Sequence, residues 1–232
     1  MMPSLPDPFH ALVIGASGTI GAAFVDLLQA APRCASVTGL HRHSHPAIDF
    51  ADEDSIARAA SELAAGPTFH LIINAAGLLH GEDFMPEKRL ADLSYAQMQA
   101  TFQANTFGPA LVLRHFVPLL NRERAVMAML SAKVGSIGDN RLGGWYSYRA
   151  SKAALNMMIK TAAIEVARTQ QNSILVALHP GTVNSRLSRP FRGETIGRPA
   201  AAAAADMLRV LDALVPADSG AFRSWDGTQL PW

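Results

Sequence analysis

The sequence has very little of what builds disulfide frameworks or membrane spans. It contains one cysteine, Cys34, in 232 residues, which excludes an internal disulfide and any site made of several thiolates. No stretch approaches the roughly 18 consecutive apolar residues that a transmembrane helix needs. The opening residues lack the basic and apolar segments of a secretory signal peptide. We therefore expect a cytoplasmic protein that makes no membrane contact.

Excess charge of either sign is also missing. Twenty basic side chains stand against nineteen acidic ones, for a formal net charge of +1. A nucleic-acid binder normally carries a basic stripe, so we expect no nucleic-acid partner.

Of the eight histidines, His41, His43 and His45 lie close together in the sequence. No acid or cysteine stands at ligand spacing beside them, so we predict no metal site.

Apolar segments of two kinds alternate along the whole chain. Short continuous runs predict buried strands, and longer stretches with helical spacing predict helices. The predicted strands are 9–15, 35–40, 69–74, 125–130, 173–179 and 221–225, and the predicted helices are 19–31, 54–65, 93–120, 148–168 and 199–214. This alternation is typical of a parallel sheet with helices on both faces. Because it has no break, we expect one domain over residues 1–232.

A glycine-rich loop joins the first predicted strand to the first predicted helix. It reads Gly15-Ala-Ser-Gly-Thr-Ile-Gly21. Glycines allow the backbone to turn tightly and approach a pyrophosphate, while the helix N-terminus offers free N–H groups to the anion. The loop therefore predicts a dinucleotide site.

The second predicted strand indicates which dinucleotide binds. NAD-binding chains place an acid about 20 residues after the glycines, where it bonds the ribose 2′-hydroxyl. Here no acidic residue appears before Asp49, and Arg42 stands in that region instead. A guanidinium suits a 2′-phosphate. We therefore expect NADP(H) to be preferred, with NAD(H) still possible.

Tyr148 and Lys152 are four residues apart near the start of a predicted helix, so they share one face. A free tyrosine titrates near pH ~10, too high for an efficient base at neutral pH. An ammonium about 4 Å away favours the charged phenolate and lowers the pKa of the tyrosine. This pair predicts proton transfer by Tyr148 to or from a carbonyl oxygen.

These features together resemble the short-chain dehydrogenase/reductase family over nearly the full chain. The similar segments are the glycine loop, Asn74 to Gly77, Asn105, Tyr148 to Lys152, and Pro180-Gly181. Residues 135–156 and the final eight residues resemble the C-factor and Sniffer-like carbonyl reductase branch. The resemblance implies an α/β, three-layer Rossmann fold with a doubly wound, mostly parallel, seven-stranded sheet.

The resemblance also implies roles for single residues. Tyr148 would be the acid/base, Lys152 would hold the nicotinamide ribose, and Asn105 would anchor a water in a proton relay. The full set expected to bind the cofactor is Gly15, Ser17, Gly18, Thr19, Ile20, Gly21, Arg42, Asp49, Phe50, Asn74, Ala75, Ala76, Gly77, Asn105, Tyr148, Lys152, Pro180, Gly181, Thr182 and Val183.

The serine that polarises the carbonyl in the family has no clear counterpart. The strand before the tyrosine ends Leu130-Ser131-Ala132, and a gapless comparison puts Ala132 at the catalytic position. We expect Ser131 to serve, with Ser136 as the second candidate. Without such a hydroxyl, the alternative function is an NAD(P)-binding signalling or sensor protein with little catalysis.

The sequence leaves the substrate open beyond a small carbonyl compound or alcohol. Residues 138–145 and 184–198 are the segments expected to select it, with Trp145 and Phe191 as candidate apolar contacts. The helix that carries Tyr148 is apolar nearly all round, so it must be covered on every face. The resemblance implies that a second subunit supplies part of that cover, and we expect a homodimer or homotetramer.

Overall fold

The computed structural model describes residues 2–232, and one parallel sheet forms its centre. The strands are β1 (Phe9–Ile14), β2 (Cys34–Leu40), β3 (Leu71–Asn74), β4 (Ala125–Leu130), β5 (Ser173–His179) and β6 (Phe222–Ser224). Their order in the sheet is β2-β1-β3-β4-β5-β6, and every neighbouring pair is parallel. The chain order reverses beside β1, and ligands of such sheets bind at the carboxyl ends of the strands next to that point.

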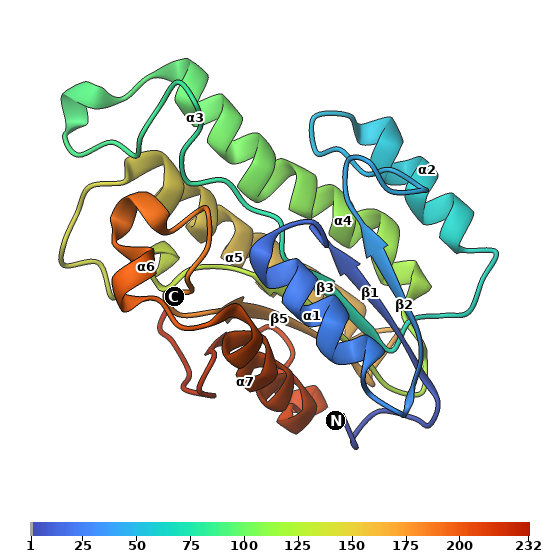
Figure 1. The fold of residues 1–232 in the computed structure, drawn as a ribbon. Helices are drawn as coiled ribbons and strands as arrows, with labels where there is room; N and C mark the ends of the chain where they lie inside the picture. Colours follow the sequence, from blue (N-terminus) through green and yellow to red (C-terminus); the bar gives the residue numbers. More distant parts are fainter. Residues whose placement is uncertain (1) are drawn as a thin grey trace.

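Helices cover both faces of the sheet (Figure 1). One face carries α1 (Thr19–Gln29) and α7 (Ala200–Ala213), which pack against each other. The other carries α2 (Glu53–Leu63), α4 (Gly108–Phe116) and α5 (Tyr146–Val166). Two shorter helices, α3 (Tyr95–Phe102) and α6 (Gly193–Ile196), lie toward the carboxyl edge. The predicted three-layer, doubly wound fold is confirmed.

Successive strand residues enter two different cores. In β1, Leu12 packs into the cluster under α2, α4 and α5, whereas Val13 packs into the cluster under α1 and α7. All six residues of β4 are buried. Burial on both faces explains why the central strands are continuous apolar runs, without polar alternation.

The described residues form six strands, so the expected seven-stranded sheet is wrong by one. Residues 41–52, between β2 and α2, fold back on themselves. Ser44 Oγ donates to the carbonyls of His41 and Pro46, and the Ile48 N–H bonds the His41 carbonyl. These local bonds use backbone groups that a further strand would offer to a neighbour, and β2 remains the edge of the sheet.

The predicted helix over 93–120 consists of several consecutive pieces. α3 passes into a π-helical turn, Gln103–Phe107, which passes into α4, and a 3₁₀ turn over Val117–Leu119 follows. Such π turns insert one residue into a helix and change the direction of its side chains, and they are frequent at functional sites. Asn105 lies at the centre of this turn.

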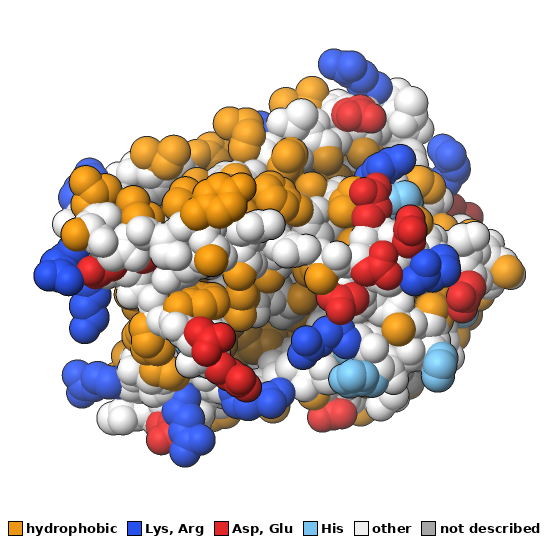
Figure 2. Space-filling view, turned by 90° about the horizontal axis from the view of Figure 1, so that it is seen from above, with side chains coloured by type: hydrophobic (Ala, Val, Ile, Leu, Met, Phe, Trp, Pro, Cys, Tyr) orange, Lys and Arg blue, Asp and Glu red, His pale blue; other side chains and the backbone are white. Residues whose placement is uncertain are grey.

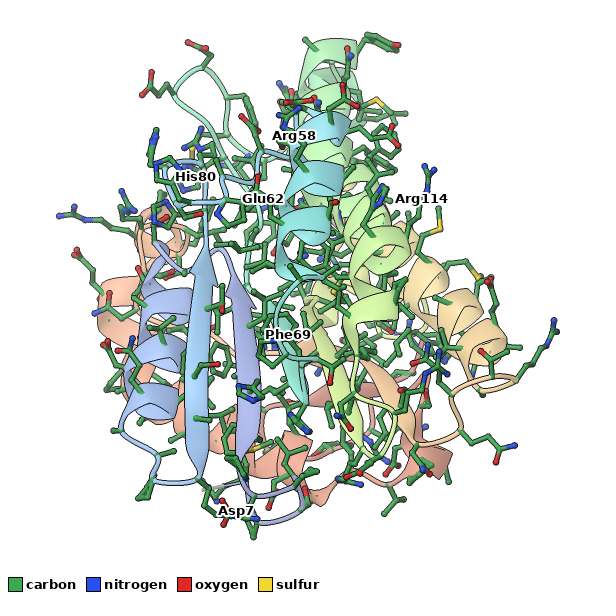
Figure 3. The ribbon with its side chains drawn as sticks, turned by 90° about the vertical axis from the view of Figure 1, so that its right-hand side faces the viewer. Asp7, Arg58, Glu62, Phe69, His80 and Arg114 are labelled. Carbon is green, nitrogen blue, oxygen red and sulfur yellow. The ribbon has the colours of Figure 1, made fainter. Side chains whose placement is uncertain are left out.

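The two ends of the sheet differ in what they present. In Figure 3, Asp7 lies at the lower end, before β1 begins, and His80, which follows β3, lies at the upper end. The upper end is therefore the carboxyl edge, where the loops of the candidate site gather. No helix within residues 2–232 has the length and apolar character required to cross a membrane.

Candidate active site

The glycine loop brings β1, α1 and the chain after β3 unusually close together. Gly15 has φ +82°, and a Cβ atom there would lie 2.8 Å from the amide nitrogen of Ala76. A Cβ on Gly21 would lie 2.1 Å from the carbonyl oxygen of Gly15. Gly18 is the N-cap of α1 and has no side chain to cap it. The first-turn N–H groups therefore remain available to an anion.

A cavity of about 420 Å³ opens beside this loop. Nine of the residues predicted to bind the cofactor line it: Gly15, Ser17, Gly18, Arg42, Asp49, Phe50, Ala75, Ala76 and Gly77. Arg42 is exposed, and none of the ion pairs found in residues 2–232 involves it. The cavity thus combines a backbone cradle for phosphate with a guanidinium that has no carboxylate partner.

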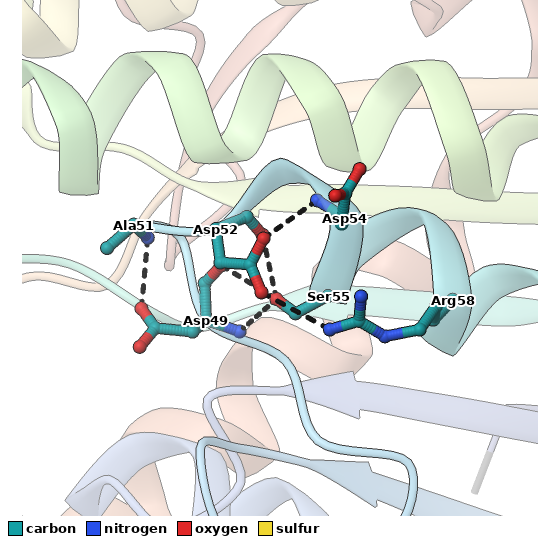
Figure 4. A network of polar contacts seen from close by, with 6 residues as sticks. All are labelled: Asp49, Ala51, Asp52, Asp54, Ser55 and Arg58. Atoms are coloured by element: carbon teal, nitrogen blue, oxygen red, sulfur yellow. Dashed lines mark hydrogen bonds and ion pairs between the residues drawn. The ribbon is translucent and has the colours of Figure 1, made fainter.

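The wall formed by Asp49 and Phe50 is fixed by polar contacts at the start of α2 (Figure 4). The Asp49 N–H donates to Ser55 Oγ, which in turn donates to the Asp49 carbonyl. Asp52 caps α2 by accepting from the Asp54 N–H. The ring of Phe50 packs against Gly108 of α4, where any Cβ would lie 2.3 Å from the ring. This side of the cavity is therefore held firmly in place.

A second cavity of about 310 Å³ lies further along the carboxyl edge. Nine predicted residues line it: Ile20, Ser131, Trp145, Tyr148, Pro180, Gly181, Thr182, Val183 and Phe191. Leu78 lines the first cavity and Leu79 the second, so the two meet at the loop after β3. Figure 2 looks onto this face and shows a hollow flanked by hydrophobic side chains.

Tyr148 and Lys152 are both buried, at 8% and 3% relative exposure. The ammonium lies 5.8 Å from the centre of the Tyr148 ring and donates to the Leu130 carbonyl at 3.0 Å. Burial raises the pKa of the Tyr148 phenol and lowers the pKa of Lys152 to about 8. In the chain alone the expected fall in the tyrosine pKa is therefore absent, because loss of hydration outweighs the nearby ammonium. The Tyr148 phenol is therefore protonated at neutral pH.

Asn105 ties three elements together around the tyrosine helix. Its side-chain nitrogen donates to the Leu78 carbonyl and to Ser151 Oγ, and its oxygen accepts from the Leu78 N–H. A Cβ on Gly77 would lie 3.4 Å from the Asn105 oxygen and 3.5 Å from the Lys152 ammonium. Asn105, Lys152 and the chain at Gly77 are therefore immediate neighbours.

The two candidate serines lie in different surroundings. Ser131 lines the second cavity with Tyr148, and its hydroxyl donates to Asn156 Oδ1 at 2.6 Å. Ser136 Oγ bonds the Trp232 carbonyl and the Asp139 N–H, away from that cavity. Ala132 packs with Leu79 and Tyr148 in a small apolar cluster. Only Ser131 therefore shares the cavity of the tyrosine.

Comparison with known proteins decides the family. The sequence profile of the family described as Enoyl-(Acyl carrier protein) reductase matches residues 22–219. A Rhodococcus protein, 1-hydroxy-2-glutathionyl-2-methyl-3-butene dehydrogenase, is 33% identical over 188 residues, which is 81% of this chain and 79% of the relative. The chain belongs to the short-chain dehydrogenase/reductase family. It is an NAD(P)-dependent oxidoreductase of that family.

Further relatives of this short-chain dehydrogenase/reductase lie in the expected branch. C-signal of Myxococcus xanthus is 36% identical over 177 residues, which is 75% of this chain and 98% of the relative. NADPH-bound carbonyl reductase from chicken fatty liver superposes with a TM-score of 0.83, at 27% identity, and covers 98% of this chain and 100% of its own. Carbonyl reductase Sniffer of D. melanogaster, with a TM-score of 0.83, 22% identity and coverage of 96% and 99%, shares the fold.

Some predicted residues lie outside both cavities of this dehydrogenase/reductase. They are Thr19, Gly21, Asn74, Asn105 and Lys152. The buried side chains of Asn74, Asn105 and Lys152 each bond a neighbouring segment. Asn74, for example, accepts the Ala76 N–H at 3.1 Å and shapes the chain that lines the first cavity.

Sequence reasoning missed three polar residues in or near the site. Two of them, His179 and Lys133, line the second cavity. Burial and the charge of Lys133 lower the pKa of His179 to about 4. Its position directly before Pro180-Gly181, at the end of β5, was the available signal. The buried carboxyl group of Glu87 was also missed, because nothing local in its loop indicates what it bonds.

His179 makes the stability of this short-chain dehydrogenase/reductase depend on pH. The unfolded chain protonates His179 near its ordinary pKa of 6.5, whereas the folded chain does so only near 4. The contribution of neutral His179 to the free energy of unfolding is fully present above pH 6.5. It is lost as the pH falls toward 4, at up to about 1.4 kcal/mol per pH unit. Urea unfolding from pH 7 down to about 5 should show this slope, and His179→Gln should reduce it.

His45→Gln is the matched control, because His45 is exposed. His70 adds a smaller slope of the same sign, since burial also lowers its pKa. An unchanged slope in His179→Gln would contradict the burial of a neutral imidazole in the cavity.

Proposed function

We propose that the protein interconverts a carbonyl compound and an alcohol with NADP(H), and that Tyr148 is the acid/base. The observation that carries this proposal is a buried, protonated phenol in the same cavity as Ser131 and residues 180–183. The glycine cradle and the cavity beside it fit a dinucleotide. The dinucleotide, when bound, supplies or accepts the hydride.

The residues of the chain would then act as follows. The N-terminus of α1 and the loop glycines bind the pyrophosphate, and Pro180, Gly181, Thr182 and Val183 border the nicotinamide side. Ser131 orients the carbonyl oxygen by a hydrogen bond once its hydroxyl turns from Asn156 Oδ1 to that oxygen. Tyr148 gives its proton to that oxygen, or takes it back in the reverse direction. Lys152 holds the ribose, and Asn105 anchors a water that relays the proton toward solvent.

Loss of the phenol tests this mechanism. Tyr148→Phe keeps the ring and removes only the proton donor, so turnover should fall by about 10²–10⁴-fold. NADPH binding should persist, because the phosphate cradle is untouched. Steady-state assays on a panel of ketones and aldehydes, with fluorescence titration of NADPH, check both expectations. Tyr146→Phe, two residues away on the same helix, is the matched control and should retain activity.

The alternative function is an NAD(P)-binding sensor with little catalysis. Two observations favour it: Ala132 occupies the expected serine position, and Ser131 already donates to Asn156. Its signature would be tight NADPH binding by the wild type without measurable reduction of any carbonyl in the panel. Equal activity of the wild type and Tyr148→Phe would remove the proposed acid/base.

The preference for NADP(H) is proposed on the free guanidinium of Arg42 at the first cavity. The known structure of a chicken carbonyl reductase with NADPH bound agrees with it. Arg42→Ala should weaken NADPH binding by about tenfold to a hundredfold, the value of a hydrogen bond to a charged group. NADH binding should hardly change.

Thermal-shift titration with both cofactors measures this difference, since binding stabilises the fold in proportion to RT ln(1 + [L]/Kd). Arg122→Ala, an exposed arginine on the loop before β4, serves as the control. A wild-type preference for NADH would refute the role of Arg42.

We propose that the protein is a homodimer or homotetramer in which α4 and α5 meet their symmetry mates. Met157, Met158 and Ile164 of α5 are 66%, 45% and 53% exposed. Met158 lines a hollow of about 630 Å³ between α4 and α5. A single domain over residues 1–232 and a cytoplasmic location remain predictions.

A charge placed on this face tests the oligomer. Met158→Arg should weaken association by about a hundredfold, because a buried unpaired charge costs several kcal/mol. Analytical ultracentrifugation over a range of concentrations measures the shift. Val215→Arg is the control, since Val215 is 52% exposed but follows α7 on the other side of the sheet. A wild type that sediments as a monomer at all concentrations would exclude the interface.

A further inference from the structure

The helix that carries Tyr148 begins at a strained turn. Gly143, Gly144 and Trp145 all have left-handed backbone angles, with φ of +63°, +63° and +54°. For a bulky residue such as Trp145 this conformation costs about 1–2 kcal/mol and persists only where its surroundings enforce it. Trp145 is also the N-cap of α5, and its side chain supplies no capping bond. Contacts from residues outside the helix must therefore stabilise this turn.

Glu87, from the loop between β3 and α3, supplies that hold. Its carboxyl group accepts the backbone N–H of Ser147 at 3.2 Å and also accepts the Ser147 hydroxyl. Its own carbonyl accepts the Trp145 N–H. Glu87 therefore performs the capping that an N-cap side chain normally performs from within the helix.

The burial of Glu87 shows how specific this arrangement is. The residue is only 2% exposed, although acidic side chains are almost never fully buried without partners. Its loop is itself tied to α3, because the Gln97 side-chain amide donates to the Met85 carbonyl. From the other side, the Arg149 guanidinium donates to the carbonyls of Gly143 and Gly144. The turn is thus clamped between two elements.

We infer that Glu87 is a positioning residue for Tyr148, an inference that rests on the proposed function. Ser147, which Glu87 holds, is the residue directly before Tyr148. The Trp145 ring lies 6.2 Å from the Tyr148 ring and 4.9 Å from the Phe191 ring. Movement of the turn would therefore shift both the proton donor and the apolar wall of the second cavity.

The first test is kinetic. Misplacement of a reacting group by about 1 Å costs up to a hundredfold in rate. Glu87→Ala should lower kcat by about tenfold to a hundredfold and leave the Kd for NADPH within about threefold. Glu87→Gln should recover most of kcat, because its amide accepts from the Ser147 N–H and donates to the hydroxyl. Glu82→Ala, an exposed acid on the same loop, is the matched control.

The second test does not need turnover. The chain has three tyrosines, so in a Tyr95→Phe, Tyr146→Phe background the absorbance of tyrosinate reports Tyr148 alone. Burial raises the pKa of this phenol. After a rapid alkaline pH jump, Tyr148 should ionise at lower pH in Glu87→Ala, because a loosened first turn admits water. With Glu87→Gln it should ionise as in the parent.

The two tests separate failure of the inference from failure of the proposed function. A wild type inactive on every carbonyl would count against the function, and the titration would still test Glu87. A folded Glu87→Ala with parental kcat and parental titration overturns the positioning role. Should Glu87→Ala fail to fold, Ser147→Ala removes the hydroxyl contact alone. An unchanged Tyr148 titration and kcat in that variant overturn the inference equally.

Discussion

The contact between the Lys152 ammonium and the Leu130 carbonyl fixes the relation of α5 to the sheet. It joins a helix residue to the last residue of β4, where the ladder with β5 ends. A buried cation needs such a partner, because an ammonium without one would cost several kcal/mol in this apolar region. The position of Tyr148, one turn earlier on the same helix, follows from that bond. So does the proximity of Ser131, the first residue beyond the strand.

The same burial acts on two groups in opposite senses. It raises the pKa of the phenol and lowers that of the ammonium, since in each case it disfavours the charged form. The chain by itself thus prepares an acid at neutral pH, which suits reduction of a carbonyl. Sequence spacing suggested instead that the ammonium would dominate. Spacing gives the distance between two groups but says nothing about how much water surrounds them.

The sequence predicted most of the fold because the central strands β3, β4 and β5 are buried on both faces. β4 and β5 begin and end where the apolar runs do, and the helix ends differ by a few residues. The apolar runs predicted six strands, as observed. The seventh was expected only from the family resemblance, and here the bonds of Ser44 fold the chain after β2 back on itself instead. The π turn at Asn105 was missed because it changes the helix by one residue, which the spacing of apolar residues hardly registers.

In the candidate site too, local sequence patterns were predictable and contacts between distant residues were not. The glycine loop, the Tyr148–Lys152 pair and the segment after β5 are local patterns. Most of their residues line two adjoining cavities, and Lys152 lies just outside them. Glu87 and His179 act through contacts between distant parts of the chain. Glu87 is sixty residues from the serine it bonds, so no local pattern identifies it.

The segment that borders the second cavity from residue 184 to 197 is closed at its base. Val183 bridges to Arg198, the Asn184 N–H bonds the Arg198 carbonyl, and the Arg198 N–H bonds the Thr182 carbonyl. The guanidinium of Arg198 stacks 3.7 Å from the Trp225 ring, anchoring this base to the end of the sheet. A loop whose two ends are hydrogen-bonded to each other is closed at its base and is structurally separate from the scaffold that carries it. The interior of this loop can therefore be lengthened, shortened or rewritten, and with it the wall of the second cavity, without disturbing the sheet.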